Sequence, residues 1–235
     1  GRAVNGANFV YFGMRSRSCD DPKCIEMVKY ADLVLDALGI MQGPSHMEVM
    51  YCEDGPCLVE VGSRIQGGEG TWLPVAKECI GFTAVEITID CYLDGKQWAQ
   101  LDKDRYDLKK HGREVDMVNR YAGVVRSMPG EAKLKALPSY RSHCWEVKAN
   151  DYAPLTIDCF TRPGCVQLVN EEETQADADF EAIHELEQMG LIDYSIICPE
   201  PPVIGAVVIV DAFSSGANLA ALTIEWGYKL VLVIS

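Results

Sequence analysis

One β-hairpin signal restricts the fold of this chain more than any other feature, because it fixes how two strands must pair. Apolar-rich runs at 47–52 and 57–61 are separated by Asp54–Pro56, which is a turn signal. The pattern predicts a hairpin with a glutamate on each arm, Glu48 and Glu60. The length of the loop sets the register, since a shift of one residue moves every side chain to the opposite face.

Glu48 and Glu60 lie an even number of residues apart, so a regular hairpin puts them on one face only if its loop is odd. Pro56 has no N–H to donate to a strand ladder, which favours the three-residue loop Asp54–Pro56. That loop sets Glu48 opposite Gly62 and makes Glu60 its diagonal neighbour, ~7–8 Å away along the backbone. Proteins usually hold Mg²⁺ through one or two carboxylates and substrate phosphates, so this pair is a candidate metal site. A surface hairpin with two solvated glutamates has the same pattern.

Arg64 and the glycine-rich run Gln66–Gly70 form a second candidate site, for an anion. An arginine can pair with a phosphate or carboxylate while glycine N–H groups approach the same anion. His46 can contact a phosphate or orient a carboxylate. A glycine-rich turn beside a solvated arginine, and a hydrogen-bonded structural histidine, explain the same residues.

Composition limits the partners and the compartment. Of the 235 residues, 48% are hydrophobic, which is enough for a sizeable core. The net charge of −14 argues against nucleic acid and against an anionic membrane surface as partners. The sequence shows no apolar run of membrane-spanning length and no signal peptide. The ten cysteines include no C-x-x-C pair, so we expect free thiols in a reducing intracellular compartment such as the cytoplasm.

Apolar spacing predicts two amphipathic helices. The first begins at Asp21-Pro22 and ends at Gly39, with apolar side chains at helical spacing between them. The second covers 171–189, with an acidic first turn, and ends at Gly190. Residues 82–93 fit both strand and helix periodicity, so the pattern leaves that segment open.

Short β-type runs broken by glycine and proline account for most of the remaining sequence before residue 170. Those after residue 101 predict a small β-rich subdomain. The runs expected as strands are 9–14, 114–119, 123–127, 144–147, 155–160 and 166–169.

The character of the sequence changes after a Pro-rich linker at 198–204. Buried-type strands at 206–210 and 230–234 flank a helix at 219–226, which together predict the opening β-α-β of a parallel sheet. The turn at 211–216 lies where such sheets bind nucleotides but lacks their fingerprints, so it is a weak signal. A lone β-α-β cannot bury both faces of its strands, so we expect the chain to be cut from a longer protein.

Four segments taken together resemble the C-terminal lobe of the ATP-grasp ligases, which couple ATP hydrolysis to joining a carboxylate and an amine. The segments are Leu38–Ile40, Gly43–Glu48, Gly55–Arg64 and Gly67-Gly68. The resemblance implies that Glu48 and Glu60 bind Mg²⁺ (or Mn²⁺) bridging the ATP phosphates. It implies that Arg64 stabilises the transferred phosphoryl group or the acyl phosphate.

The same resemblance implies that His46, Gly67 and Gly68 bind phosphate or substrate. Family members usually read Glu-x-Asn-x-Arg at the second carboxylate, and Gly62 occupies the asparagine position here. A second, fully ligated Mg²⁺ therefore has less support than the first.

The resemblance runs over residues 8–190 and implies a fold of the α+β / α/β type, an ATP-grasp C-terminal lobe with an antiparallel sheet and helices. A small β-rich subdomain and a partial Rossmann-like β-α-β follow it. The implied domains are the lobe with the metal hairpin (1–101), the β-rich subdomain with the amphipathic helix (102–197), the linker (198–204) and the start of a following α/β domain (205–235).

Two hypotheses for function follow from this resemblance. In the first, the chain is part of a tandem-repeat ATP-grasp ligase that uses ATP, a carboxylate and an amine. No segment supplies the central ATP-binding lobe, so the isolated chain should be inactive and should need other modules or a homo-oligomer. In the second, the chain is a non-catalytic structural module whose ATP-grasp repeats associate head to tail, because the strand edges of the terminal β-α-β need cover.

Overall fold

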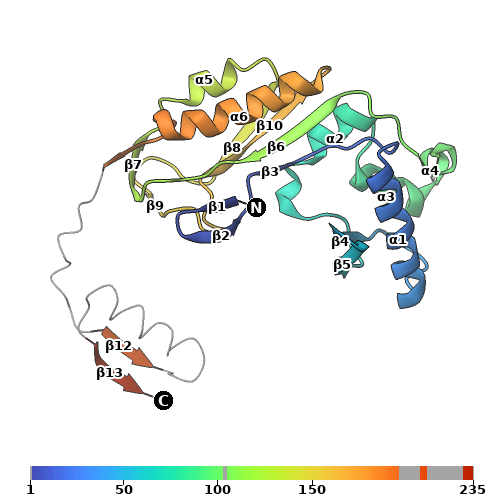
Figure 1. Cartoon of the computed structure of the whole chain (residues 1–235), viewed down its shortest axis with the longest axis horizontal. Helices are drawn as coiled ribbons and strands as arrows, with labels where there is room; N and C mark the ends of the chain where they lie inside the picture. Colours follow the sequence, from blue (N-terminus) through green and yellow to red (C-terminus); the bar gives the residue numbers. More distant parts are fainter. Residues whose placement is uncertain (1, 103–104, 196–206, 211–229, 235) are drawn as a thin grey trace. The chain divides into compact units, whose positions relative to one another are not determined.

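A computed structural model of the chain describes residues 2–102, 105–195, 207–210 and 230–234 (Figure 1). The chain divides into two compact units, Gly1–Tyr194 and Ser195–Ser235. The larger unit combines antiparallel sheets with helices, and the smaller one contains a pair of parallel strands. This mixed architecture with antiparallel sheets confirms the predicted fold class.

The described helices are α1 (Pro22–Leu38), α2 (Leu73–Ile80), α3 (Ala84–Leu93), α4 (Lys96–Gln100), α5 (Glu131–Lys135) and α6 (Glu173–Met189), with a 3₁₀ turn at Gly68–Gly70. The strands of the larger unit are β1 (Arg2–Val4), β2 (Ala7–Val10), β3 (Gly13–Arg15), β4 (His46–Cys52), β5 (Gly55–Gly62), β6 (His111–Asp116), β7 (Gly123–Ser127), β8 (Tyr140–Trp145), β9 (Tyr152–Ala153), β10 (Gly164–Asn170) and β11 (Asp193–Ser195). Among these helices, none combines the length and the apolar character needed to cross a membrane.

The central sheet has the strand order β3-β6-β10-β8, and all its neighbours are antiparallel. β3 comes before α1 in the chain and pairs with β6, where Met14 lies opposite Glu114. The sheet therefore joins strands from both sides of the predicted domain boundary at residue 101. Three smaller sheets of the larger unit are β1-β2, β4-β5 and β11-β7-β9.

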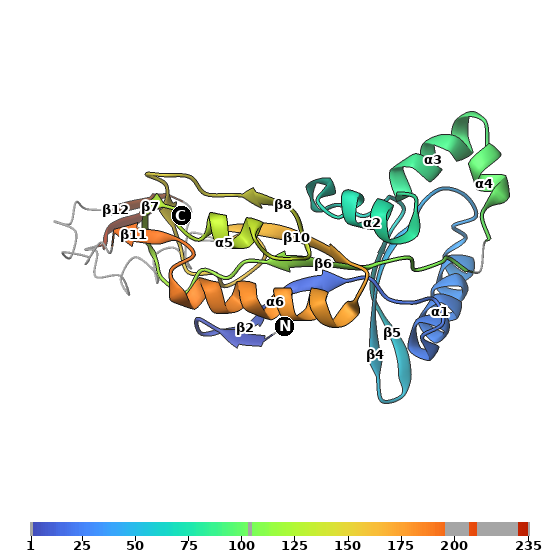
Figure 2. The same ribbon diagram turned by 90° about the horizontal axis from the view of Figure 1, so that it is seen from above.

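Helices cover both faces of the central sheet. Successive residues of a strand point to opposite faces. In β6, Gly112 faces Val75 and Cys79 of α2, whereas Arg113 pairs with Asp177 of α6. Figure 2 shows α2 and α6 on either side of β6 and β10. The main core cluster includes the fully buried side chains of Val115, Met117, Val125, Leu134, Val166, Leu168 and Ile183.

The structure confirms both helices that apolar spacing predicts. The Asp21 carboxylate caps α1 by accepting the Lys23 N–H at 2.9 Å, and Gly39 ends the helix with φ of +68°. α6 ends at Gly190, whose φ is +104°. These caps satisfy backbone groups that the helix itself leaves without partners.

The ambiguous segment 82–93 is the helix α3. The Thr83 hydroxyl accepts the Glu86 N–H at 3.1 Å, and the Glu86 carboxylate accepts the Thr83 N–H at 3.0 Å. This reciprocal pair is a capping box, which favours a helix over a strand of the same periodicity.

The strand predictions are confirmed in part. The prediction at 123–127 coincides with β7, and those at 114–119, 144–147 and 166–169 overlap β6, β8 and β10. The segment predicted as one strand at 9–14 is split between β2 and β3. A side chain at Gly13 would lie 2.0 Å from the Glu114 carbonyl oxygen, so the chain approaches β6 there by its bare backbone.

The predicted strand at 155–160 is wrong. The Thr161 hydroxyl oxygen accepts the N–H groups of Ile157 and Asp158 at 2.9 and 3.1 Å. These bonds close the segment into a turn, so its apolar residues do not form a ladder.

In the smaller unit, β12 (Val207–Val210) and β13 (Leu230–Ile234) pair in parallel. The two strands predicted for this region are therefore confirmed. The predicted linker at 198–204, the turn at 211–216 and the helix at 219–226 lie outside the described residues.

Gly112 should be intolerant of any side chain, because the contact between α2 and β6 is direct. A Cβ at this position would lie 2.3 Å from Val75 Cγ1 and 2.7 Å from Cys79 Sγ. We expect Gly112→Ala to lower the free energy of unfolding in urea by about 1–3 kcal/mol. Gly67→Ala is the control, since its Cβ would meet nothing within 4 Å. Equal stability of the two variants would contradict this packing.

Candidate metal and phosphate site

The hairpin formed by β4 and β5 has a shorter loop than the sequence predicts. Cys52 pairs with Gly55, so the turn contains only Glu53 and Asp54. The predicted three-residue loop Asp54–Pro56 is therefore wrong. Gly55 adopts φ of +105°, a conformation that suits glycine, and begins the second strand.

Pro56 fits in this strand because of its place in the ladder. The residues that flank a two-residue turn form a hydrogen-bonded pair, and pairs then alternate along the hairpin. Cys52–Gly55 is the hydrogen-bonded pair, so the next pair, Tyr51–Pro56, needs no N–H donor. The missing N–H of Pro56 therefore does not exclude a two-residue turn.

A β-bulge restores the common face of the two glutamates. In a regular ladder with this turn, Glu48 would lie opposite Val59. The register instead passes from Val49–Leu58 to Glu48–Glu60, so Val59 is an extra residue on β5. Glu48 lies directly opposite Glu60, and their Cβ atoms are expected to be about 4.5–5.5 Å apart.

The predicted register of Glu48 and Glu60 is therefore wrong. The prediction that both side chains lie on the same face of the hairpin is nevertheless correct. Glu48 does not pair with Gly62, which lies opposite His46. The glutamates share a face because of the bulge and not because of an odd loop. Their role as metal ligands stays a prediction.

The two faces of the hairpin differ in exposure. One face packs toward α1 and carries the half-buried side chains of Val49 and Leu58. The other face is open to solvent. Its exposed residues, in alternation along the two strands, are Glu48, Met50, Cys52, Cys57 and Glu60.

Glu48 and Glu60 form an uncompensated pair of like charges. Among the described residues, neither carboxylate has an ion-pair partner, and no three His, Cys, Asp or Glu side chains group together as metal ligands. Like charges directly opposite on a hairpin are destabilising. A divalent cation between the carboxylates would relieve this repulsion, with its other positions left to water and phosphate oxygens. The donor set therefore fits Mg²⁺ better than a metal held in an all-protein cage.

Arg64 and His46 lie together beyond the glutamate pair. Arg64 Nη1 is 3.4 Å from His46 Nδ1 and donates to the Ile65 carbonyl at 3.1 Å. The Arg64 side chain is exposed, which leaves other N–H groups of the guanidinium open to solvent and able to pair with an anion. A Cβ at Gly62 would meet Arg64 Cγ and Nε at 3.5 Å, an ordinary contact, so packing does not require glycine there.

The predicted substrate residues Gly67 and Gly68 lie on an open loop after Arg64. A side chain at either position would meet nothing within 4 Å, and Gly68 has φ of +74°. The Thr71 hydroxyl donates to the Gly68 carbonyl at 2.9 Å and closes the 3₁₀ turn. Strand pairing therefore places His46, Glu48 and Glu60 near one another on the hairpin, and Arg64 joins them through its contact with His46. Gly67 and Gly68 follow Arg64 only along the chain.

A row of three polar side chains and Met14 on the central sheet lies next to the glycine loop, and sequence reasoning missed it. Met14, Glu114, Gln167 and Ser142 lie side by side on neighbouring strands. Gln167 Nε2 donates to the Glu114 carboxylate at 3.1 Å, and the Ser142 hydroxyl donates to Gln167 Oε1 at 2.8 Å.

The loop contacts this row at two points. Gln66 Nε2 lies 3.7 Å from Met14 Sδ, and the Thr71 side chain is near enough to Glu114 to favour the charged form of its carboxyl group. Only 2% of Glu114 is exposed, and this burial raises the pKa of its carboxyl group. Strand alternation alone gives no sign that Glu114 is buried.

Comparisons with known proteins find one relative by sequence and several solved structures with a similar fold. No family model matches the chain. A curated relative, dapdiamide A synthase from Enterobacter agglomerans, is 26% identical over 173 residues, which cover 71% of this chain and 40% of the relative.

Two solved structures share the fold. The L-amino acid ligase from Bacillus licheniformis matches with a TM-score of 0.65 and 18% identity, over 80% of this chain and 47% of that protein. The phosphoribosylglycinamide synthetase from Anaerococcus prevotii matches with a TM-score of 0.57 and 14% identity, over 79% and 45%. The chain therefore spans less than half the length of each relative, and at these identities the structural matches show the fold alone.

Removing one charge of the glutamate pair should stabilise the metal-free chain. With EDTA present, we expect Glu60→Gln to raise the free energy of unfolding in urea by about 0.2–1 kcal/mol, because it removes a like-charge opposition. Glu53→Gln, in the turn of the same hairpin, is the control and should have no such effect. A loss of stability in Glu60→Gln would contradict the direct opposition of the two carboxylates.

Glu114 should make stability depend on pH in a defined direction. Burial raises its pKa above the ordinary value of 4.5, so the folded state holds this proton to higher pH than the unfolded state. The contribution of Glu114 to the free energy of unfolding is therefore most favourable below pH 4.5, and it is lost as the pH rises through the raised pKa. We expect the stability of Glu114→Gln relative to the wild type, measured by urea unfolding, to increase from pH 4.5 to pH 7. A relative stability that does not change with pH would contradict the raised pKa.

Proposed function

Since this chain has the fold of the ATP-grasp superfamily, we propose that it is part of an ATP-dependent, Mg²⁺-requiring carboxylate–amine ligase. In this proposal a carboxylate is activated as an acyl phosphate, and an amine then displaces the phosphate. The curated relative is a synthase, and the structural relative with a TM-score of 0.65 is an L-amino acid ligase. Both names are compatible with this class of reaction.

The observation that carries the proposal is the register at the bulge. It puts Glu48 opposite Glu60 on the exposed face of the hairpin, with Arg64 and His46 at the same end of the strands. Mg²⁺ bound by the two carboxylates would supply positive charge against the phosphates of ATP. The hairpin would position the two carboxylates for the metal, because strand pairing holds both of them on one rigid element.

Arg64 has the chemistry to bind the transferred phosphoryl group. Its guanidinium can donate two parallel hydrogen bonds to phosphate oxygens, and its exposure leaves it accessible. Gly67 and Gly68 present backbone to open space, so an anionic substrate can approach their N–H groups closely. His46, in contact with Arg64, orients the guanidinium or touches the same anion.

The rest of the ATP site should lie outside this chain. The chain spans 40–47% of the length of the relatives described above. We propose that a further segment of the polypeptide or a partner chain contributes the ATP-binding lobe, as in a tandem-repeat or homo-oligomeric ligase. The proposal keeps the predicted domain boundaries, one after residue 101 and one at the linker that begins at residue 198. The first boundary divides the sequence and not the central sheet, which joins strands from both sides of it. The nine described cysteines are free thiols, which fits a reducing intracellular compartment.

A non-catalytic module is the second candidate. In the smaller unit, β12 and β13 pair only with each other among the described residues, so each strand has an unpaired edge. Parallel strands normally lie inside larger sheets. A second copy could cover these edges, and the repeats would then assemble head to tail without turning over ATP.

ADP release by the longest native form of the protein separates the two candidates. The ligase proposal expects Mg²⁺-dependent ADP release that Glu60→Gln reduces by about 100-fold or more, because several kcal/mol of charge stabilisation depends on the metal. The matched control Glu53→Gln should keep the wild-type rate. The isolated 235-residue chain should release no ADP.

Two outcomes contradict the ligase proposal. One is an unchanged rate in Glu60→Gln. The other is a native form that assembles normally but never hydrolyses ATP with any carboxylate and amine, which supports the structural module.

A further inference from the structure

The bulge at Val59 requires a cause, because the hairpin has a regular alternative. The two-residue turn and the position of Pro56 are both compatible with an uninterrupted ladder in which Glu48 pairs with Val59. In that ladder Glu60 would point to the face that packs on α1. An extra residue leaves backbone groups without their regular partners, so contacts between the hairpin and the rest of the chain can decide between the two registers.

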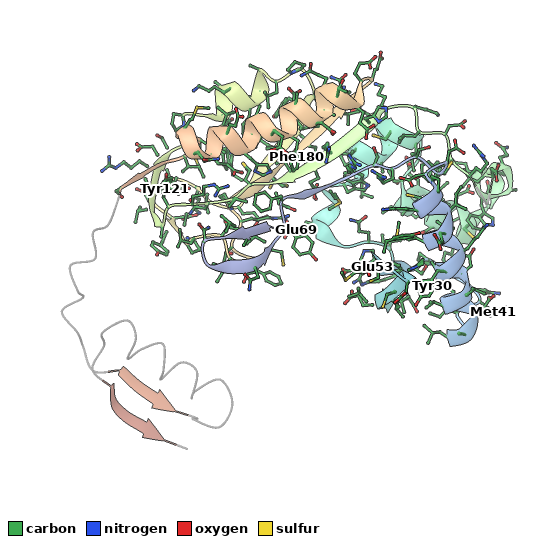
Figure 3. The ribbon with its side chains drawn as sticks, viewed as in Figure 1. Tyr30, Met41, Glu53, Glu69, Tyr121 and Phe180 are labelled. Atoms are coloured by element: carbon green, nitrogen blue, oxygen red, sulfur yellow. The ribbon has the colours of Figure 1, made fainter. Side chains whose placement is uncertain are left out.

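Tyr30 of α1 contacts β5 at the residue just before the bulge. Its hydroxyl oxygen accepts the Leu58 N–H at 3.1 Å. Counting from the turn, Val49–Leu58 is a non-hydrogen-bonded pair, so the Leu58 N–H points away from β4 and has no partner within the hairpin. Tyr30 is half-buried where α1 meets the hairpin, as Figure 3 shows. The phenol therefore satisfies the last donor of the regular part of the strand.

A second contact holds the other strand to the same helix. The Tyr51 hydroxyl donates to the Glu26 carboxylate, and Lys23 Nζ lies 5.1 Å from the centre of the Tyr51 ring. Glu26 and Tyr30 are one helical turn apart, so one side of α1 contacts both strands. These contacts fix the turn end of the hairpin, and only the Tyr30 contact adjoins Val59.

We infer that Tyr30 is a positioning residue for the proposed metal site. Its hydroxyl holds Leu58 against α1, so that β5 bends at Val59 and turns Glu60 to the exposed face opposite Glu48. The link from register to metal binding rests on the proposed function, whereas the link from Tyr30 to register does not.

The test compares two variants of the full chain that each remove one hydroxyl between α1 and the hairpin. Tyr30→Phe removes the bond next to the bulge, and Tyr51→Phe removes the bond near the turn. Cross-strand nuclear Overhauser effects report whether Glu48 lies near Glu60 or near Val59. Titration with Mn²⁺ alone reports metal binding through broadening of the Glu48 and Glu60 signals, and urea unfolding reports overall stability.

In Tyr30→Phe we expect the Glu48–Val59 contacts to appear at the expense of Glu48–Glu60. We expect Mn²⁺ to bind about fivefold more weakly, the factor that corresponds to one ordinary hydrogen bond. Tyr51→Phe should keep the wild-type register and Mn²⁺ affinity, even if it lowers overall stability by as much as Tyr30→Phe.

An unchanged Glu48–Glu60 register in Tyr30→Phe overturns the inference, and so does an equal loss of register in Tyr51→Phe. If Mn²⁺ broadens neither glutamate in the wild type, the proposed metal site fails. The Overhauser contacts still decide the role of Tyr30 in that case.

Discussion

The proposed metal and phosphate site depends on one constraint, the direct opposition of Glu48 and Glu60 across the bulge at Val59. Strand pairing makes it a property of the backbone, so neither carboxylate has to find its place through a flexible side chain alone. The pair is unfavourable without a cation, because two like charges face each other in solvent. A surface hairpin selected only for stability has no need of such a pair, whereas a Mg²⁺–phosphate site commonly uses one or two carboxylates.

Two sets of contacts hold the proposed site in place, one from residues before Arg64 in the chain and one from residues after it. Before it, α1 lies along the hairpin and contacts both strands through Tyr30 and Glu26. After it, the glycine loop contacts the central sheet where Gln66 Nε2 lies 3.7 Å from Met14 Sδ. The sheet in turn is kept in place by α6 on one face and α2 on the other. The exposed residues proposed to bind ligands thus depend on contacts with α1 and with the central sheet that bind no ligand themselves.

Local signals in the sequence were sufficient for some elements and not for others. Asp21 and Gly39 define α1 because caps act within a few residues, and the Thr83–Glu86 capping box settles a segment that periodicity leaves open. The hairpin itself follows from its apolar runs. Its loop length did not, because Pro56 is excluded only from hydrogen-bonded positions, and the bulge at Val59 depends on α1, far away in the sequence. The Glu114 row was missed because its burial is decided by tertiary packing, which strand alternation does not reveal.

The central claim is that Glu48 and Glu60 bind one metal ion together with the phosphates of ATP. A crystal structure of the longest native form with Mg²⁺ and a non-hydrolysable ATP analogue tests it most directly. We predict one Mg²⁺ within coordination distance of both carboxylates and of phosphate oxygens, about 2.0–2.1 Å in each case, with Arg64 directed at the terminal phosphate. A nucleotide-bound structure in which Glu60 faces α1, or in which the metal binds phosphates without either glutamate, would contradict the account.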